Sequence, residues 1–441
     1  MLEFINNFIG ADVLDYVLSG INAVYPILVF PIIFGTTRSL WLFWRQSVAR
    51  AKMSFVVLEM RIPREILKSP QAMEQVLAGL HGLRSSASPF KINIREKYWD
   101  GEFTKWFTLE MVSDGGELHF YIVTDKKLRS LVETSFFAYY SDLELIEVPD
   151  YMSRIPKNTG ELEAQDKDIW AIELALGKEE AYPIKSYTEF ESPDDAKKFD
   201  PASIFLEIMS KIQKVEFLSI QIVISPGDPK WSEAFDDLLE EIKGLKGEED
   251  SDLKNLSKLY ARTPGETEVL KAVEKNLSKP CFDTIIRIFY LSPRGTFLDS
   301  YARRGIIGAF NQYSNLELNS FKQNFSTGTG VLAWSPPYFF AGIRTKYRKN
   351  RFLDWYRRRD VPPETWMGRW ITSTLWNKNF SSKFIKLNTE SLASIFHPPT
   401  NLVLTAPHIK RMESKKASPS AGMSIFGDEK DIEMFTRPPK K

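Results

Sequence analysis

Residues 16–37 read YVLSGINAVYPILVFPIIFGTT, the longest stretch of the chain without an Asp, Glu, Lys or Arg. A helix of about 20 such residues spans a bilayer core about 30 Å thick. The run LWLFW follows at residues 40–44, and tryptophan favours the membrane–water interface. The sequence therefore predicts an N-terminal transmembrane helix, with these membrane-anchor residues: Tyr16, Tyr25, Pro26, Pro31, Trp41 and Trp44.

Charge predicts the orientation of this helix. Acidic residues precede it and basic residues follow it: Glu3, Asp12 and Asp15 before, and Arg38, Arg45, Arg50 and Lys52 after. Basic residues stay on the cytoplasmic side of a membrane. We therefore expect a single-pass protein of the inner (cytoplasmic) membrane, with its N-terminus outside and its body in the cytoplasm.

Three alternatives for residues 16–37 stay open. A cleaved signal peptide requires a basic start and a small-residue cleavage site, and the sequence shows neither. A buried helix of a soluble protein would be kinked at Pro26 and Pro31. An interfacial or re-entrant helix is favoured by Arg38, which shortens the apolar span.

The composition of the whole chain is that of an ordinary globular protein. Hydrophobic residues make up 43% of the 441 residues, and 58 Lys and Arg nearly balance 57 Asp and Glu. The chain beyond the anchor is long enough for two or three domains, and its near-neutral charge argues against a protein that is basic throughout. Cys281 is the only cysteine, so no internal disulfide can form, which suits a reducing compartment.

The first unit after the anchor, residues 53–150, alternates strands and helices. Alternating and β-branched runs predict strands at 54–62, 105–112, 117–123 and 143–148, and helical spacing predicts helices at 71–83 and 125–139. The order is strand, helix, strand, strand, helix, strand. This order predicts a ferredoxin-like βαββαβ domain.

The second unit, residues 169–325, repeats this order after a polar linker at 151–168. Strands are expected at 169–176, 217–225, 282–291 and 316–321, with helices at 201–212 and 298–312. An acidic, lysine-rich insertion at about 228–263 separates the two central strands. The predicted fold class is α+β: a transmembrane helix, two ferredoxin-like domains, the second with a helical insertion, and an aromatic and basic C-terminal region.

Residues 326–400 are rich in aromatic and basic side chains, and residues 401–441 form a tail that is poor in aromatics. Eight basic residues cluster in the first of these regions: Arg344, Lys346, Arg348, Lys349, Arg351, Arg357, Arg358 and Arg359. Such a stretch can hold anionic lipid, bind single-stranded nucleic acid or form an ordinary solvated helix surface. We expect the lipid contact, and the other two interpretations stay open.

No motif of a familiar active site is present in the sequence. The phosphate loop G-x-x-x-x-G-K-[ST] is absent, and the glycine-rich run TGTG at residues 327–330 lacks its lysine. The histidines are scattered without metal-ligand spacing: His81, His119, His397 and His408. We therefore predict a non-enzymatic protein that needs no cofactor or metal.

Three runs carry a resemblance to a known group of proteins. Residues 63–82 read PREILKSPQAMEQVLAGLHG, residues 384–399 read FIKLNTESLASIFHPP, and residues 413–416 read ESKK. These runs resemble a family of membrane-anchored bacterial proteins. Its members are similar to the N-terminal, non-motor region of conjugation and type IV secretion coupling-type ATPases of the HerA/FtsK class. The motif positions retained here are Asn388, Thr389, Glu390 and His397.

The resemblance implies a membrane-anchored accessory or adaptor protein. Such a protein would dock to a separately encoded ATPase or to other subunits of a type IV secretion or conjugation-like apparatus, and a homo-oligomer is possible. The motif residues are expected to be structural, because Asn388 or Thr389 can cap the helix that follows. Two alternatives stay open: a membrane-tethered nucleic-acid-binding protein using residues 344–359, and an enzyme of another type.

Overall fold

A computed structural model describes residues 11–63, 68–82, 94–190, 199–243, 263–297, 301–331, 340–372 and 382–399. Within these ranges, the side chains of residues 11–28 and 301–302 are not described. The expected tail at 401–441 and the middle of the insertion, residues 244–262, lie outside the described residues.

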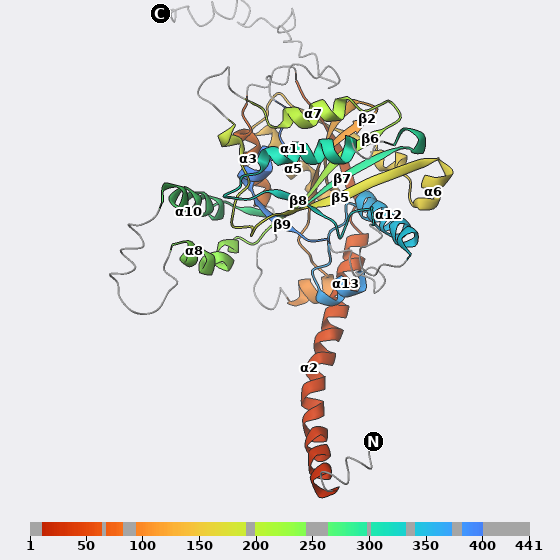
Figure 1. Cartoon of the computed structure of the whole chain (residues 1–441), viewed down its shortest axis with the longest axis vertical. Coiled ribbons are helices and arrows are strands. Elements are labelled where there is room, and N and C mark those ends of the chain that lie inside the picture. Colours follow the sequence, from red (N-terminus) through yellow and green to blue (C-terminus); the bar gives the residue numbers. More distant parts are fainter. Residues whose placement is uncertain are drawn as a thin grey trace, which may run out of the picture.

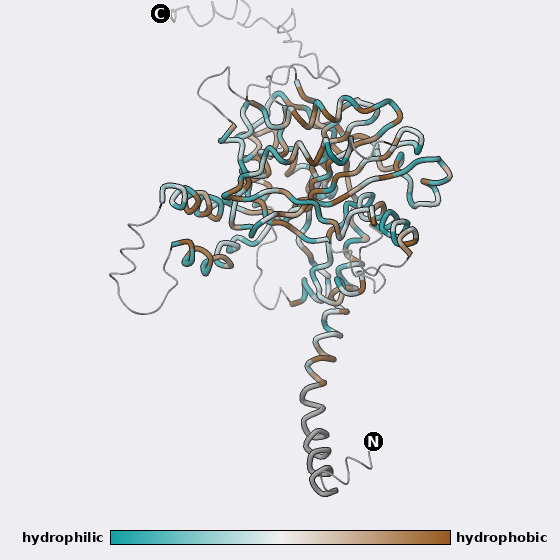
Figure 2. Tube along the Cα trace, in the orientation of Figure 1, coloured by the Kyte–Doolittle hydropathy of each residue, from teal (hydrophilic) through white to brown (hydrophobic). Residues whose placement is uncertain are grey.

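The described part of the chain is built on one nine-stranded antiparallel sheet (Figure 1). The strands are β1 (Phe55–Arg61), β2 (Phe107–Asp114), β3 (Glu117–Asp125), β4 (Glu144–Val148), β5 (Lys167–Leu176), β6 (Phe217–Pro226), β7 (Cys281–Pro293), β8 (Phe321–Asn324) and β9 (Ile385–Asn388). Eight strands lie in the order β4-β1-β3-β2-β6-β7-β5-β8, and β9 pairs with the start of β7. Hydrophobic residues dominate these central strands (Figure 2), so the sheet provides the core.

Two four-stranded halves meet at the middle of this sheet. Strands β1 to β4 form one half and strands β5 to β8 form the other. β2 and β6 pair from Phe107 opposite Ile224 to Asp114 opposite Phe217. The prediction of two ferredoxin-like domains is therefore wrong. Each half presents an edge strand to the other, and backbone hydrogen bonds satisfy both edges by joining them into one sheet.

One face of the sheet is covered by helices that share a single core. These helices are α3 (Gln71–His81), α5 (Arg129–Phe137), α7 (Ala202–Ser210), α11 (Ile306–Phe310) and α14 (Thr389–Ile395). Successive strand residues point to opposite faces, so Leu58, Leu109, Ile220 and Ile286 all contribute to this core. Because the core crosses the junction of β2 and β6, the two halves form one body.

The opposite face is covered by α12 (Ala341–Arg358), α6 (Thr159–Ala164) and the short turn η3 (Tyr151–Arg154). α12 buries Phe352, Leu353 and Tyr356 against this face, because helical spacing places the three side chains on one stripe. Residues 151–164, which were expected to be a linker, therefore belong to the folded body.

α2 (Ala11–Ala51) projects from the body as one 41-residue helix (Figure 1). Its last turns contact the turn η1 (Glu96–Asp100) and α13 (Trp366–Thr372). Gly368 permits the close approach of α13, because a Cβ there would lie 2.5 Å from Cδ2 of Phe43 on α2. The Gln46 side chain adds a hydrogen bond from its Nε2 to Glu364 Oε2 at 3.0 Å.

The prediction of a transmembrane helix at residues 16–37 is wrong. Within the residues that the structure describes, no helix is both long and apolar enough to cross a membrane. Ser19, Gly20, Asn22 and Thr36 interrupt the apolar run and lower its mean hydropathy. The expected single-pass location in the inner membrane rested on this helix and is corrected with it.

The insertion between β6 and β7 packs as a small satellite core. The turn η6 (Trp231–Phe235), α8 (Asp236–Ile242) and α10 (Pro264–Leu277) gather around Trp231, Val273 and Cys281. α10 begins with a capping box between Thr263 and Glu266. Burial raises the pKa of the Cys281 thiol to about 12, so this thiol is a packing residue.

The other helical turns are short: η2 (Lys126–Leu128), η4 (Tyr187–Glu189), η7 (Arg294–Thr296), η8 (Tyr301–Gly305) and η9 (Asn311–Tyr313).

Candidate functional site

Six polar or aromatic residues lie side by side across six strands, on the face that α12 partly covers. In strand order they are Glu59 (β1), Tyr121 (β3), Glu110 (β2), Gln221 (β6), Arg287 (β7) and Glu173 (β5). Each is the direct ladder partner of the next. We call these six residues the transverse row. Directly opposed side chains in antiparallel strands are close enough to interact, so the register alone brings them together.

One end of the transverse row is buried. Arg287 Nε donates to Glu173 Oε1 at 3.0 Å, and Arg287 Nη1 donates to Gln221 Oε1 at 3.2 Å. Arg287 Nη2 donates to the carbonyl oxygen of Asp360 at 2.6 Å, and the guanidinium lies 5.7 Å from the ring centre of Trp355. A buried charge needs such complete pairing, because an unpaired one is strongly destabilising.

Arg359 closes the middle of the row from above. It follows the last turn of α12 in a left-handed conformation (φ 53°), which turns its side chain down onto the sheet. Its Nε donates to Glu110 Oε1 at 2.8 Å, and its Nη1 donates to Asp150 Oδ2 at 2.8 Å. Burial disfavours the charge of Arg359, but Glu110 and Asp150 raise its pKa well above the ordinary value.

Stacked aromatic rings connect this buried middle to the open end. The ring centre of Tyr151 lies 5.3 Å from that of Tyr121, and Tyr121 lies 5.7 Å from His119 in a parallel stack. The Tyr151 hydroxyl donates to Glu110 Oε2 at 2.9 Å. Burial, reinforced by the Glu110 carboxylate, raises the pKa of Tyr151 well above its ordinary value, so the hydroxyl keeps its proton.

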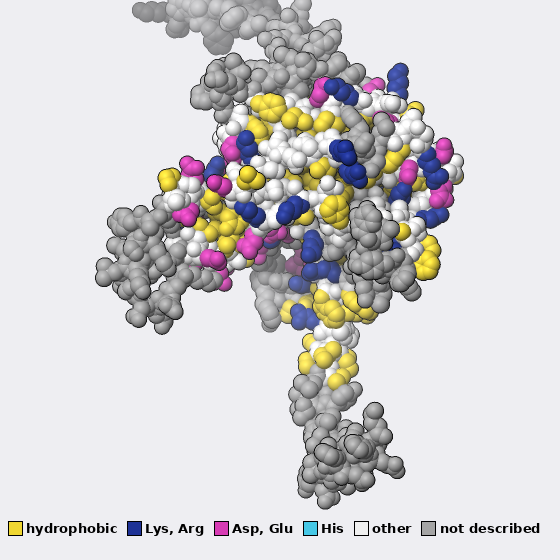
Figure 3. All heavy atoms as spheres, viewed as in Figure 1, with side chains coloured by type: hydrophobic (Ala, Val, Ile, Leu, Met, Phe, Trp, Pro, Cys, Tyr) yellow, Lys and Arg dark blue, Asp and Glu magenta, His cyan; other side chains and the backbone are white. Residues whose placement is uncertain are grey.

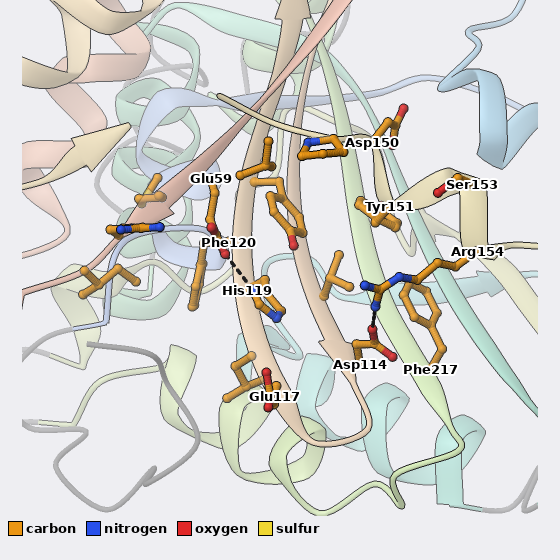
Figure 4. Close-up of a pocket in the computed structure, with 18 residues that line it drawn as sticks. Glu59, Asp114, Glu117, His119, Phe120, Asp150, Tyr151, Ser153, Arg154 and Phe217 are labelled. Carbon is orange, nitrogen blue, oxygen red and sulfur yellow. Dashed lines mark hydrogen bonds and ion pairs between the residues drawn. The ribbon is translucent and has the colours of Figure 1, made fainter. Parts of the chain in front are cut away.

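The open end of the row forms one wall of a pocket of about 700 Å³ (Figure 4). Its lining comes from β1, β2, β3, the start of β6 and the segment around η3. Glu59 Oε1 lies 2.6 Å from His119 Nδ1, and Arg154 forms an ion pair with Asp114 at the rim. Four carboxylates line the pocket, Glu59, Asp114, Glu117 and Asp150, against two arginines, Arg61 and Arg154.

The chemistry of this pocket is that of recognition by charge and by ring faces. Carboxylates attract a cation and hydrogen-bond its donors, and the faces of tyrosine rings attract cations as well. Among the described residues, no group of three or more His, Cys, Asp or Glu side chains has a geometry that could hold a metal ion.

The predicted basic stretch lies on α12 and at its end, where most of its charges have partners within the protein. Arg348 is buried and donates to the carbonyls of Phe325 and Gly328, and Arg357 donates to the carbonyls of Met152 and Ile155.

The remaining members of the stretch have surface partners or ring contacts. Lys346 pairs with Glu163, Lys349 pairs with Asp168, and Arg358 pairs with Asp354. Arg351 lies over the Trp355 ring, and Arg344 also has a partner. Among the eight, only Lys346 and Arg358 are exposed, and the other six are partly or fully buried, so little of the predicted charge faces outward.

The motif residues of 388–397 lie on the helix-covered face of the sheet, opposite the face that carries the transverse row. Asn388 Oδ1 accepts from the Ser391 backbone N–H at 2.7 Å and caps α14, which buries Thr389. Glu390 contacts Lys275 and Lys279, and although burial opposes its charge, these lysines and Ser186 lower its pKa to about 2.

His397 Nε2 lies 2.9 Å from Asp200 Oδ1 inside the same face of the protein. Burial opposes the imidazolium form, but the Asp200 carboxylate raises the pKa of His397 above its ordinary value. Both contacts hold segments together, so the motif residues act here as packing and capping groups.

The predicted anchor residues have two different placements. Tyr16, Tyr25 and Pro26 belong to the part of α2 whose side chains are not described, and Pro31 is exposed on α2. Trp41 and Trp44 lie at the root of α2, by which we mean its C-terminal part, where the helix contacts η1 and α13; their ring centres are 5.2 Å apart.

Trp41 and Trp44 belong to a larger group of exposed tryptophans. They are joined there by Trp99 of η1 and by Trp366 and Trp370 of α13, all exposed. We call these five tryptophans the aromatic collar. Hydrophobic side chains gather where α2 meets the body (Figure 3), so the collar is the most prominent apolar feature at this junction.

Sequence reasoning missed the transverse row and the pocket. A signal was present, because five of the six strands carry a charged or amide residue within a mostly apolar run: Glu59 in VVLEM, Glu110 in TLEMV, Glu173 in AIELA, Gln221 in SIQIV and Arg287 in IIRIF. A single polar residue in an otherwise apolar strand usually indicates a position that faces solvent. Only the pairing of the strands shows that all of them share one face and one level.

Comparisons with known proteins give the family and little else. No curated protein matches the chain. Among solved structures, the chain is similar to the xylooligosaccharide oxidase from Myceliophthora thermophila C1 in complex with xylobiose, at 13% identity and a TM-score of 0.25. That similarity covers 70% of this chain and 53% of the oxidase chain, so the protein spans about half the oxidase's length. A TM-score this low carries no argument about fold or activity.

A family model matches residues 48–333, which is more than half of the chain and includes strands β1 to β8, the transverse row and the pocket. The chain therefore belongs to the family described as Domain of unknown function (DUF8128).

Proposed function

We propose that the protein is a non-enzymatic accessory or adaptor protein. In this proposal it docks to a separately encoded ATPase of a type IV secretion or conjugation-like apparatus. The observation that carries the proposal is the aromatic collar at the root of α2. Contiguous exposed apolar surface marks interaction sites, and tryptophan is strongly enriched among the residues that dominate binding energy.

The collar is held in place by contacts within the protein. Trp41 Nε1 donates to the carbonyl of Tyr98 at 2.7 Å, and the Trp41 ring lies 6.3 Å from the ring of Trp99. On α13, the Met367 backbone N–H donates to Ser39 Oγ at 3.2 Å. A preorganised surface loses little conformational entropy on binding, which favours a defined partner over casual association.

α2 extends this apolar surface beyond the collar. Phe30, Ile32, Ile33 and Phe34 are all exposed, within little more than one turn of the helix. A helix that is apolar on several sides is normally buried against something else. Helices of a partner protein would bury it, and the resemblance of residues 384–399 to the non-motor region of secretion ATPases supports an ATPase as that partner.

The test is binding between the full-length protein and a HerA/FtsK-class secretion ATPase from the same genome, measured by calorimetry. Trp366→Ser with Trp370→Ser should weaken the affinity by at least about tenfold, since buried tryptophans are typical hot spots. The matched control is Phe325→Ser with Leu316→Ser, because both residues are exposed apolar side chains outside the collar.

Two results would overturn the adaptor proposal. One is the absence of saturable binding to the ATPase by the unaltered protein. The other is equal loss of affinity in the collar variant and in the control variant. Saturable, salt-sensitive binding of single-stranded DNA that depends on Lys346 and Arg358 would instead support the nucleic-acid alternative.

A further inference from the structure

Tyr121 brings a hydroxyl to the pocket at the open end of the transverse row. Tyr121 is 8% exposed and lines the pocket. Its ring stacks between His119 and Tyr151, but among the described residues no group hydrogen-bonds its hydroxyl. The Tyr121 hydroxyl is therefore available to donate or accept a hydrogen bond with a molecule that enters the pocket.

The chain itself shows which chemistry suits this face of the sheet. One arginine belongs to the transverse row and a second bonds the row from the end of α12, and each is held by a carboxylate and an aromatic ring. Arg287 pairs with Glu173 and lies over the Trp355 ring, and Arg359 pairs with Glu110, with its guanidinium 5.6 Å from the ring centre of Tyr151.

The open end presents the same two elements toward the pocket. Glu59 supplies the carboxylate and Tyr121 supplies the ring, and the two are direct ladder partners. Asp114 and Glu117 add negative charge at the far side of the pocket. An anionic ligand would meet more carboxylates than arginines there, so the charge of the lining favours a cation.

We propose that this pocket binds a basic side chain, an arginine or a lysine, from an exposed segment of a partner protein. The ammonium or guanidinium group donates to Tyr121 Oη and to the Glu59 carboxylate and faces the stacked rings, and the Asp114 carboxylate attracts it from the far side of the pocket. This site is separate from the aromatic collar, and its occupant need not be the ATPase.

Arg154 acts as an internal competitor for this site. Its guanidinium forms an ion pair with Asp114 at the rim, and its side chain is 71% exposed. Such an exposed ion pair contributes little to stability, so it is readily exchanged. Through this ion pair Arg154 neutralises Asp114, so it competes with an entering basic side chain for the negative charge of the pocket.

The probe is the acetylated and amidated peptide Gly-Gly-Arg-Gly-Gly, with its Gln counterpart as the neutral control. Binding to the full-length protein is measured by saturation-transfer NMR at millimolar peptide. The Arg peptide should bind saturably, the same peptide with Lys should also bind, and the Gln peptide should not. Tyr121→Phe should weaken binding about two- to tenfold, the effect of one hydrogen bond.

Substitutions of the acidic and basic residues of the pocket should change the peptide affinity in opposite directions. Glu59→Gln and Asp114→Asn should each weaken binding about two- to fivefold, whereas Arg154→Ala should strengthen it by a similar factor because the competitor is gone. The matched controls lie on α12: Arg358→Ala, whose side chain is 68% exposed in a single ion pair, and its partner change Asp354→Asn. Both controls should leave binding unchanged.

Urea unfolding of each variant separates loss of the site from loss of the fold. Tyr121→Phe should keep the unfolding midpoint of the unaltered protein, because its hydroxyl bonds no described residue. Equal binding of the Arg and Gln peptides would overturn the proposal. Unchanged affinity in folded Tyr121→Phe and Glu59→Gln would overturn it too, and so would weaker binding in Arg154→Ala. A failure of ATPase binding at the collar leaves all of these outcomes unaffected.

Discussion

The two ends of the transverse row contain similar residues in opposite surroundings. Glu173 at one end is buried and bonded to Arg287, beneath the end of α12. Glu59 at the other end is paired with His119 and lines an open pocket. The strands are alike in both places, so the difference comes from the segment that covers them. A charged strand residue becomes part of a core or part of a binding surface according to what packs above it.

The largest expected effect on stability comes from Arg359, which joins the end of α12 to the transverse row. Arg359→Met removes the guanidinium that bonds Glu110 and Asp150, and it leaves the buried Glu110 carboxylate without this counter-charge. The free energy of unfolding should fall by about 3–5 kcal/mol in urea titrations, the usual cost of breaking a buried pair.

The neighbouring residue supplies the control for this change. Arg358→Met alters the same type of side chain one position earlier, at an exposed ion pair, and should change stability by less than about 0.5 kcal/mol. Equal stability of the Arg359→Met and Arg358→Met variants would mean that the contacts of Arg359 with Glu110 and Asp150 do not stabilise the protein.

The same substitution at both ends tests the comparison directly. Glu173→Gln leaves the buried Arg287 without its carboxylate and should cost about 3 kcal/mol of unfolding free energy. Glu59→Gln alters a partly exposed pair and should cost no more than about 1 kcal/mol. Equal losses of unfolding free energy in Glu173→Gln and Glu59→Gln would show that burial beneath α12 does not make the Glu173 pair the more important for stability.

The smallest expected effect is a pH dependence at Asp150, which lines the pocket and also bonds Arg359. Burial alone would raise the pKa of Asp150, but the Arg359 guanidinium lowers it below its ordinary value of 3.8. A carboxyl whose pKa is lower in the folded state stabilises the protein above its unfolded-state pKa and loses that contribution as pH falls through the folded value.

Asp150→Asn should therefore be less stable than the unaltered protein at pH 7 by about 1 kcal/mol, the scale of a partly exposed pair. The difference should shrink as the pH falls below about 4, and urea midpoints at pH 7, 4 and 3 measure it. Asp354→Asn serves as the control, and it should show no comparable narrowing. If the stability difference between Asp150→Asn and the unaltered protein stayed constant from pH 7 to pH 3, the ion pair between Asp150 and Arg359 would not contribute to stability.

Individual strands show which parts of the fold the sequence pattern could predict. Alternation predicts strands at 54–62 and 117–123, close to β1 (Phe55–Arg61) and β3 (Glu117–Asp125). The strand expected at 316–321 lies instead at β8 (Phe321–Asn324), and β9 (Ile385–Asn388) was not expected at all. Both observed strands have only four residues, too few for a periodic pattern to be visible.

The basic stretch shows the opposite failure, a clear pattern whose meaning changed on folding. Eight charges in sequence predict an outward-facing surface, yet Arg348 and Arg359 are buried. Their partners are the Phe325 and Gly328 carbonyls and the Glu110 and Asp150 carboxylates, which lie far away in the sequence. Composition cannot distinguish a charge that meets solvent from one that meets a distant carboxylate.

The sequence by itself determined which residues of each strand share a face, because side chains alternate with a period of two. It also limited the helix start to Asn388 or Thr389, because capping depends on neighbouring residues, and the structure assigns the cap to Asn388. The tertiary structure alone decided that β2 pairs with β6, that six polar residues form one row, and that α12 covers only one end of it. These are contacts between residues distant in the chain, and local patterns hold no information about which edges and faces will meet.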